Sequence, residues 1–308
     1  MYIDAYINAL CDNLPDDCIP NELDIILEGG ALNGSYHLGV LMYIKHLESM
    51  NKLKVNRISG VSVGSLVGCL YYTSSFDNSD KYFNTIISSY KENGYIDNLK
   101  NVCNEIINKE GDDFYKKINN KLFISYYNYC DKKYIVKSEF ENNKDLIQSL
   151  ISSCHLPGII NGCVKSEIDA LDGGFPFIFN DSSNENKNKN KKTLFIRILT
   201  IDKILNIFRT RNEKNTIMRA SEGITSFHNF LFFKKSNKMC SYVEDWTLFD
   251  YLYQRIFEII YIFLLTLIIT IHKLYKKIPE DYLKNDFINS NCSIIKYLLK
   301  DIFTRFVI

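Results

Sequence analysis

The chain of 308 residues has no excess of charge of either sign. Its 37 Lys and Arg residues balance 36 Asp and Glu residues, which leaves a formal net charge of +1. Proteins that bind nucleic acid through its phosphates carry basic surfaces, so we expect no nucleic-acid partner. Hydrophobic residues make up 46% of the chain and charged residues 24%, which predicts a globular protein with a large core.

The sequence also lacks the spacings of metal sites and disulfide frameworks. Its nine cysteines include no Cys-x-x-Cys pair, and its five histidines form no His-x-His or His-x-x-x-His pair. An odd number of cysteines in a chain of this length favours reduced thiols in a cytosolic or nuclear compartment. We therefore expect neither a metal nor a cofactor.

Long apolar runs are scarce. The first residues lack a basic segment followed by an apolar run, so we expect no secretory signal. The run at 256–271 is interrupted only by Glu258 and would extend about 24 Å as a helix, short of a hydrocarbon core of roughly 30 Å. A buried central helix remains open. A membrane-spanning or interfacial anchor at 256–277, which ends in basic side chains, also remains open. In that case we expect a cytoplasmic, membrane-associated protein.

Two successive strand–turn–helix units are predicted near the N-terminus. The apolar run at 24–27 stops at Gly29-Gly30, and from Tyr36 onward apolar residues recur at helical spacing. A second unit has a strand at 55–59, followed by a sharp turn and another helix. Two such units favour an α/β fold in which helices cover a mostly parallel sheet.

The remaining segments are less regular. Residues 75–150 have a mostly helical pattern, with a possible boundary near Gly94. The polar segment 181–192 predicts a disordered surface loop, and 194–201 predicts a further strand. We expect a catalytic domain at 23–203 and a helical C-terminal region at 204–308.

The strongest local motif is Gly60-Val61-Ser62-Val63-Gly64, between a predicted strand and helix. A nucleophilic serine on such a tight turn needs small residues two positions away on either side, because larger side chains would collide. The N-terminus of the following helix can stabilise developing negative charge. A glycine-lined structural turn remains the alternative, since this short pattern also occurs by chance.

A second glycine-rich turn, Gly29-Gly30-Ala31-Leu32-Asn33-Gly34, has the same position between strand and helix. Backbone N–H groups in such a turn can receive the oxyanion of an acyl transfer. A phosphate-binding loop is disfavoured because there is no Gly-x-x-x-x-Gly-Lys-Ser/Thr pattern, and because Ala31 interrupts the dinucleotide pattern Gly-x-Gly-x-x-Gly. A purely structural turn remains open.

The third motif is Leu171-Asp172-Gly173-Gly174. Asp-Gly-Gly is a common turn, and by itself it indicates structure rather than chemistry. Beside a candidate nucleophile, however, a carboxylate next to two glycines has room to approach a serine as its base.

The order of these three motifs resembles the patatin-like phospholipases. The segments LEGGALNGSYHLGVL, ISGVSVGSLVGCLY and SSCHLPGI followed by LDGG are similar to that family's oxyanion segment, nucleophile turn and approach to the catalytic aspartate. The resemblance covers about 23–180. It implies a three-layer α/β/α fold and a lipid acyl hydrolase that acts on lipid substrate at a membrane surface.

The resemblance also implies a Ser–Asp dyad. Ser62 would be the nucleophile, Asp172 the base, and the N–H groups of Gly29, Gly30 and Ala31 the oxyanion hole. Two residues depart from the family pattern: Ala31 replaces a third glycine, and Asn33 replaces an Arg or Lys. Alanine in a left-handed conformation costs about 1 kcal/mol.

Two other functions stay open at this point. A Ser–His–Asp triad on another α/β fold would recruit His228 or His272, which follow Asp172 in the chain, whereas His155 precedes it. A protein that keeps the fold, loses efficient catalysis and binds membranes or partners would also be consistent with Ala31 and Asn33.

Overall fold

The computed structural model describes residues 2–164, 166, 168–179, 191–200 and 216–277. A seven-stranded sheet lies at its centre, with strand order β4-β3-β2-β1-β6-β7 and with β5 paired to β3. The strands are β1 (Glu22–Leu27), β2 (Lys54–Val61), β3 (Leu122–Asn128), β4 (Lys133–Lys137), β5 (Ala170–Asp172), β6 (Lys191–Ile196) and β7 (Cys240–Tyr242). The four central strands are parallel to one another, and β4, β5 and β7 pair antiparallel at the periphery.

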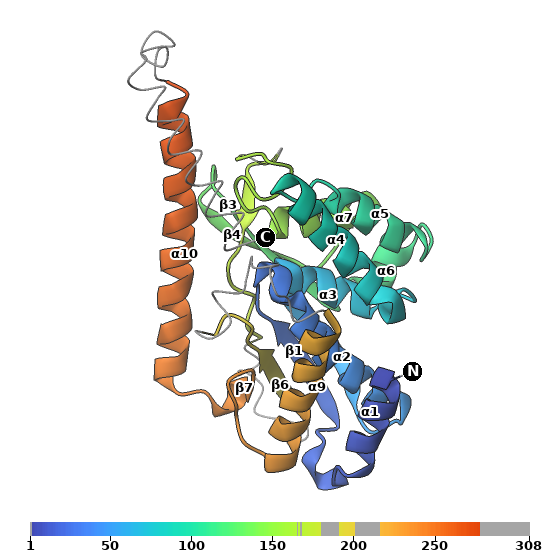
Figure 1. Cartoon of the computed structure of the whole chain (residues 1–308). Helices are drawn as coiled ribbons and strands as arrows, with labels where there is room; N and C mark the ends of the chain where they lie inside the picture. The colour runs from blue at the N-terminus through green and yellow to red at the C-terminus, as the bar shows by residue number, and fades with distance from the viewer. Residues whose placement is uncertain (1, 165, 167, 180–190, 201–215, 278–308) are drawn as a thin grey trace.

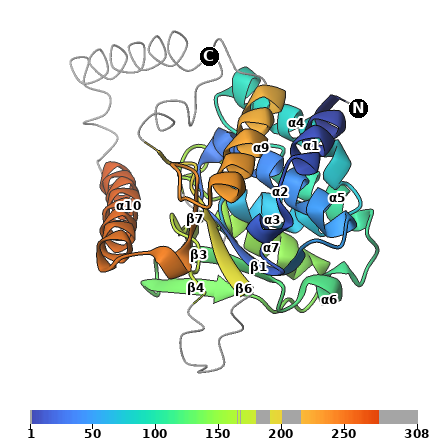
Figure 2. The same cartoon turned by 90° about the horizontal axis from the view of Figure 1, so that it is seen from below.

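Helices gather on one face of this sheet (Figures 1 and 2). They are α1 (Tyr2–Asp12), α2 (Gly34–Ser49), α3 (Val63–Tyr71), α4 (Ser79–Asn93), α5 (Leu99–Asn108), α6 (Phe114–Ile118), α7 (Asn143–Ser153) and α9 (Thr216–Phe233). Alternate residues of β1 face opposite sides, as a pleated strand requires: Ile25 and Leu27 join the large core under these helices, whereas Ile26 does not.

The other face of the sheet carries a smaller aromatic cluster. Ile26, Phe179, Phe195 and Val243 are buried there, and Trp246 packs against Phe195 with ring centroids 5.0 Å apart. The short 3₁₀ turn Val243–Asp245 leads from β7 across this face. The chain then enters α10 (Leu248–Tyr275), which begins with a reciprocal cap between Thr247 and Asp250.

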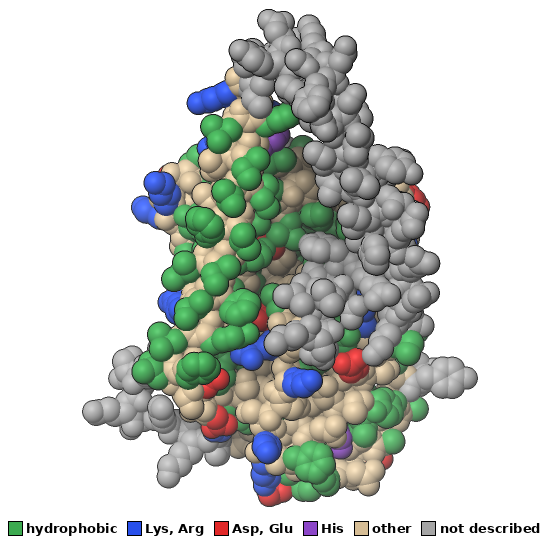
Figure 3. All heavy atoms as spheres, turned by 60° about the vertical axis from the view of Figure 1, so that its left-hand side comes forward, with side chains coloured by type: hydrophobic (Ala, Val, Ile, Leu, Met, Phe, Trp, Pro, Cys, Tyr) green, Lys and Arg blue, Asp and Glu red, His purple; other side chains and the backbone are tan. Residues whose placement is uncertain are grey.

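Helix α10 runs along the side of the molecule, next to the β3–β4 edge of the sheet (Figure 1). Only Gln254, Leu265 and Ile269 of its residues are buried, so it is not the buried central helix that the sequence left open. It is also long and apolar enough to cross a membrane by length and composition. Its large apolar side chains are mostly exposed, and Figure 3 shows them gathered along the helix.

The predicted α/β class, the mostly parallel sheet and the helical C-terminal region are confirmed. The mostly helical expectation for 75–150 is wrong at 122–137, where β3 and β4 form. β3 pairs with β2 and β4 pairs with β3, and this long-range pairing fixes the segment as strands. The expected boundary at Gly94 coincides with the end of α4, where Gly94 adopts φ +76°.

Two expectations concern the later part of the chain. The loop predicted at 181–192 lies outside the described residues except for its last two, which begin β6. Beyond residue 203, α9 packs against α2, and β7 pairs with β6 in the same sheet. The division at residue 203 stays a prediction.

Candidate active site

Ser62 occupies a sharp turn between β2 and α3. Its backbone angles, φ +54° and ψ −131°, are ones that residues with a side chain rarely adopt. A Cβ on Gly60 would lie 2.6 Å from the backbone of Gly64, and a Cβ on Gly64 would lie 2.5 Å from the Leu27 carbonyl oxygen. The turn therefore needs glycine at both positions, because a larger side chain would collide with the backbone, as the motif predicts.

The glycine-rich loop after β1 lies directly beside this serine. A Cβ on Gly29 would sit 3.3 Å from Ser62 Cβ, and one on Gly30 would sit 2.8 Å from Ile198 Cδ1. Ala31 adopts φ +44°, the left-handed conformation that favours glycine. The loop thus approaches the candidate nucleophile closely, and Ala31 holds a strained position within it.

Asn33 and Arg219 stabilise the loop from behind. Asn33 is fully buried and donates from Nδ2 to the Ile198 carbonyl oxygen at 3.3 Å, which ties the loop to the segment after β6. The buried Arg219 of α9 donates to the Leu32 carbonyl oxygen at 2.7 Å. Sequence reasoning did not find Arg219, because it lies 187 residues from its partner and in no recognisable motif.

Gly34, the last glycine of the loop, begins α2. A Cβ there would meet Val63 Cγ2 at 2.3 Å and the Phe83 ring at 2.7 Å, so the start of α2 packs tightly on the start of α3. This contact holds the glycine-rich loop and the serine turn in a fixed relation.

Asp172 ends β5 and lies next to the serine. It is 2% exposed, and Ser62 is 5% exposed. Its carboxylate accepts the Gly174 N–H at 2.8 Å, and the side chains of Ser62 and Tyr261 lie beside it, where they stabilise its charge. The following Gly173 packs against the β3 backbone, where a Cβ would lie 3.1 Å from the Ser125 carbonyl oxygen. The structure therefore brings together two residues that are 110 positions apart.

Burial raises the pKa of Asp172 from 3.8 to about 6, because the low-polarity surroundings disfavour the charged carboxylate. The neighbouring Ser62 side chain, the Gly174 N–H and the Tyr261 side chain oppose this shift of the pKa by stabilising the charge. The neighbouring Cys154 is also buried, and its thiol pKa is raised well above the ordinary value, so it remains protonated. With a pKa of about 6, the Asp172 carboxylate is largely ionised at neutral pH.

The C-terminal end of α7 supports both residues. Ser153 Oγ accepts a hydrogen bond from the Ser62 N–H at 2.8 Å and donates one to the Ser125 carbonyl oxygen at 2.7 Å. Two residues later, the His155 carbonyl oxygen accepts the Asp172 N–H at 3.0 Å. Ser153 lies in the segment SSCHLPGI that the sequence analysis singled out, although its role was not predicted.

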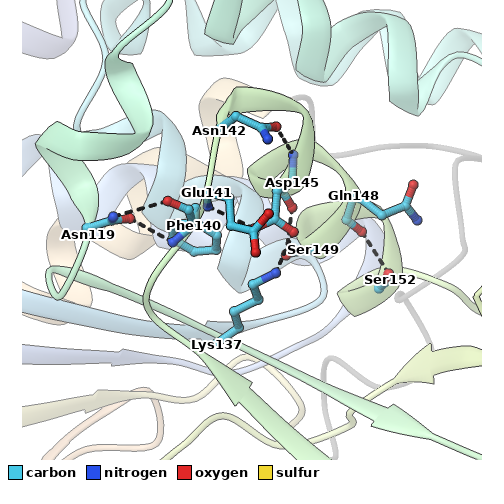
Figure 4. Close-up of polar contacts among 9 residues, drawn as sticks. All are labelled: Asn119, Lys137, Phe140, Glu141, Asn142, Asp145, Gln148, Ser149 and Ser152. Atoms are coloured by element: carbon cyan, nitrogen blue, oxygen red, sulfur yellow. Dashed lines mark hydrogen bonds and ion pairs between the residues drawn. The ribbon is translucent and has the colours of Figure 1, made fainter.

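The other end of α7 is anchored by a polar network (Figure 4). Asn142 caps the helix by accepting the Asp145 N–H at 2.9 Å, and the Asp145 carboxylate pairs with Lys137 of β4. Asn119 exchanges two hydrogen bonds with the Phe140 backbone. These contacts fix α7 against the sheet, and through Ser153 they fix the serine turn.

The histidines are engaged elsewhere. His228 Nδ1 bonds to the Tyr43 hydroxyl at 2.9 Å between α2 and α9, and His37 Nε2 bonds to the Glu28 carbonyl oxygen at 2.7 Å. Across the described segments, no histidine side chain bonds to Ser62 or Asp172. Within the same segments, no group of three or more His, Cys, Asp or Glu side chains could hold a metal ion.

A comparison with family models matches residues 25–178 to the patatin-like phospholipases. The match begins in β1, ends after the Gly173-Gly174 pair and covers half of the chain, including the three motifs that converge in the structure. No curated protein matches the chain. The fold, the convergence of the motifs and the family match together show that this chain belongs to the patatin-like phospholipase family.

Proposed function

We propose that this chain hydrolyses carboxylic esters of membrane lipids through a Ser62–Asp172 dyad. Ser62 Oγ attacks the ester carbonyl, and its proton passes to Asp172 and then to the leaving alcohol as the ester C–O bond breaks. Water then gives a proton to Asp172 and attacks the acyl group on Ser62. As the bond between the acyl carbon and Ser62 Oγ breaks, Asp172 returns the proton to Ser62 Oγ and a fatty acid is released. The N–H groups of Gly29, Gly30 and Ala31 stabilise the oxyanion of both steps.

One observation carries the proposal: a strained serine lies beside a buried aspartate while a glycine-rich loop lies against the same serine. The raised pKa of Asp172, about 6, suits a base that works near neutral pH. Family membership supports lipid acyl hydrolysis as the reaction class.

We further propose that the protein meets its substrate at a membrane surface through α10. The large apolar side chains of this helix that are more than half exposed are Leu248, Phe249, Leu252, Ile256, Ile259, Phe263, Ile271, Leu274 and Tyr275. An exposed apolar area of this extent on a folded protein marks an interaction surface, and lipid substrates lie in bilayers. The basic residues at its C-terminal end, Lys273, Lys276 and Lys277, suit anionic lipid headgroups.

The decisive experiment is labelling of the purified protein with a fluorophosphonate, which reacts with activated serines. We expect wild type to be labelled and Ser62→Ala to remain unlabelled, while the exposed control Ser49→Ala is labelled like wild type. Asp172→Asn is expected to lower hydrolysis of a soluble p-nitrophenyl ester by at least about 100-fold, because an amide cannot accept the serine proton. The matched control is Asp131→Asn, on an exposed turn.

Labelling of Ser62→Ala at the wild-type rate would exclude Ser62 as the nucleophile. A folded wild type that is not labelled, yet binds vesicles, would instead support a non-catalytic membrane-binding protein. Full activity of Asp172→Asn would exclude the dyad, and a loss of activity in His228→Ala or His272→Ala would then favour a triad.

A further inference from the structure

A side chain from α10 reaches the candidate dyad. The ring of Tyr261 lies against the Asp-Gly-Gly turn, where a Cβ on Gly174 would be 2.2 Å from Tyr261 Cδ1 and 2.7 Å from Cε1. Gly174 has φ +72°, so both its conformation and the presence of the Tyr261 ring exclude a side chain there. The Tyr261 side chain also lies beside the Asp172 carboxylate and stabilises its charge.

Packing holds this tyrosine in place. Leu265 and Ile269, one and two turns further along α10, are buried in a cluster with Leu171, the residue before Asp172. One more turn along, Lys273 Nζ lies 5.4 Å from the centroid of the Tyr129 ring. Positions 261, 265, 269 and 273 form one stripe of the helix, so the contact with Asp172 belongs to a continuous docking face.

The surroundings of Asp172 leave few groups to stabilise its charge. The serine turn contributes the Ser62 hydroxyl, and the glycine pair contributes the Gly174 N–H. Helix α7 contributes the neutral Cys154 thiol. The β4 residue Tyr134 also faces Asp172, as well as Glu258 and Arg255 of α10. Throughout the described segments no Lys, Arg or His side chain pairs with Asp172, so its ionised form depends on hydrogen-bond donors.

We propose that Tyr261 is a positioning residue for Asp172, and that it directs the carboxylate toward Ser62 and stabilises its ionised form from α10. The inference rests on the proposed dyad and adds a third side chain to it, contributed by a helix that begins 70 residues after the end of the family match. Because the donor sits on α10, the strength of the base depends on how this helix docks against the domain.

The test is the pH profile of kcat/KM for Tyr261→Phe with soluble p-nitrophenyl butyrate, a substrate that needs no membrane. Loss of a donor to the charged form raises the pKa of the base, so we expect the acid limb to move up by about one pH unit. Activity at pH 6 then falls several-fold, and activity at high pH recovers most of the wild-type value. Tyr253→Phe, at an exposed position of α10, is the matched control and keeps the wild-type limb.

An acid limb of Tyr261→Phe that superposes on the wild-type limb would overturn the inference, since a residue that only packs does not change the titration of the base. If circular dichroism shows that the Phe variant does not fold, Tyr261→Leu provides the same comparison with less bulk against Gly174. An inactive, unlabelled wild type would overturn the proposed function itself. An active wild type with an unmoved limb in the variant would overturn only the role of Tyr261.

Discussion

At the scale of single residues, Glu28 shows how the fold treats a buried carboxylate beside the site. It directly follows β1 and precedes the glycine-rich loop, and its Oε2 accepts the N–H groups of Ile198 and Leu199, each at 2.7 Å. Burial raises its pKa from 4.5 to about 7, and the two N–H groups and Arg197 oppose the shift only in part. Glu28 therefore joins the loop after β1 to the segment after β6, and its contribution to the free energy of unfolding depends on pH.

This pKa shift predicts how stability changes with pH. Between pH 4.5 and 7 the unfolded chain releases the Glu28 proton while the folded chain retains it, so this residue makes the free energy of unfolding fall as pH rises. The total change is up to about 3 kcal/mol, since one pKa unit corresponds to about 1.4 kcal/mol. In Glu28→Gln this contribution disappears, so the variant becomes more stable relative to wild type as pH rises through this range.

Denaturant unfolding of both proteins at several pH values measures the difference. Glu141→Gln, on an exposed turn, controls for the loss of one carboxylate. A stability difference between Glu28→Gln and wild type that stays constant from pH 4.5 to 8 would show that Glu28 titrates normally.

At the scale of elements, the helices behind the glycine-rich loop depend on a close crossing of α2 and α9. A Cβ on Gly39 of α2 would lie 1.9 Å from the Ala220 carbonyl oxygen, and one on Gly223 of α9 would lie 2.3 Å from the Tyr36 carbonyl oxygen. Two glycines thus let the helix backbones touch. The same crossing places Arg219 against Leu32 of the loop.

We predict that Gly223→Ala lowers the free energy of unfolding by about 1–3 kcal/mol, although alanine favours helix by about 1 kcal/mol relative to glycine. The added methyl group must push α9 away from α2. Ser221→Ala on the same helix provides the control, because it removes a side chain of intermediate exposure without adding bulk. Thermal unfolding measures both variants, and an unchanged or raised Tm for Gly223→Ala would contradict the close crossing.

Local patterns were sufficient for the elements that carry the motifs. β1 and β2 each lead into a glycine-containing turn, and the helical spacing after each turn predicts α2 and α3 within a few residues. The turn at Ser62 was predictable because a Cβ on either of its glycines would collide with nearby backbone atoms. By contrast, the pattern at 122–137 did not reveal β3 and β4, because β3 is set by pairing with β2 and β4 by pairing with β3.

The supporting residues of the site could not be predicted from local pattern. Ser153 acts on Ser62 across 91 residues, and Arg219 acts on Leu32 across 187. Tyr261 lies in an apolar run whose composition suggests only burial or membrane contact. Each of these roles depends on a packing arrangement that spacing along the chain does not encode.

At the scale of the whole molecule, α10 packs on the domain with one face and exposes the opposite face. The stripe that contains Tyr261, Leu265 and Ile269 packs on the domain beside Asp172, and the outward face exposes Ile259 and Phe263 at 67% and 64%. A helix that docks along a folded domain is not surrounded by lipid on all sides. This arrangement favours a helix that lies at the membrane surface over one that spans the bilayer.

Substitution of the outward face should therefore separate membrane binding from catalysis. We predict that the double substitution Ile259→Glu and Phe263→Glu lowers binding to phosphatidylcholine vesicles by at least about tenfold, because burial of each apolar side chain contributes about 1.5–3 kcal/mol. Hydrolysis of soluble p-nitrophenyl butyrate should stay within about twofold of wild type, since neither side chain belongs to the inner stripe. Phe233→Glu on α9 removes an equally exposed aromatic side chain and should bind vesicles like wild type. Vesicle cosedimentation measures all three proteins.

Equal binding by the double variant would place the lipid contact elsewhere on the protein. Wild-type protein that resists alkaline extraction from vesicles would indicate that α10 inserts across the bilayer.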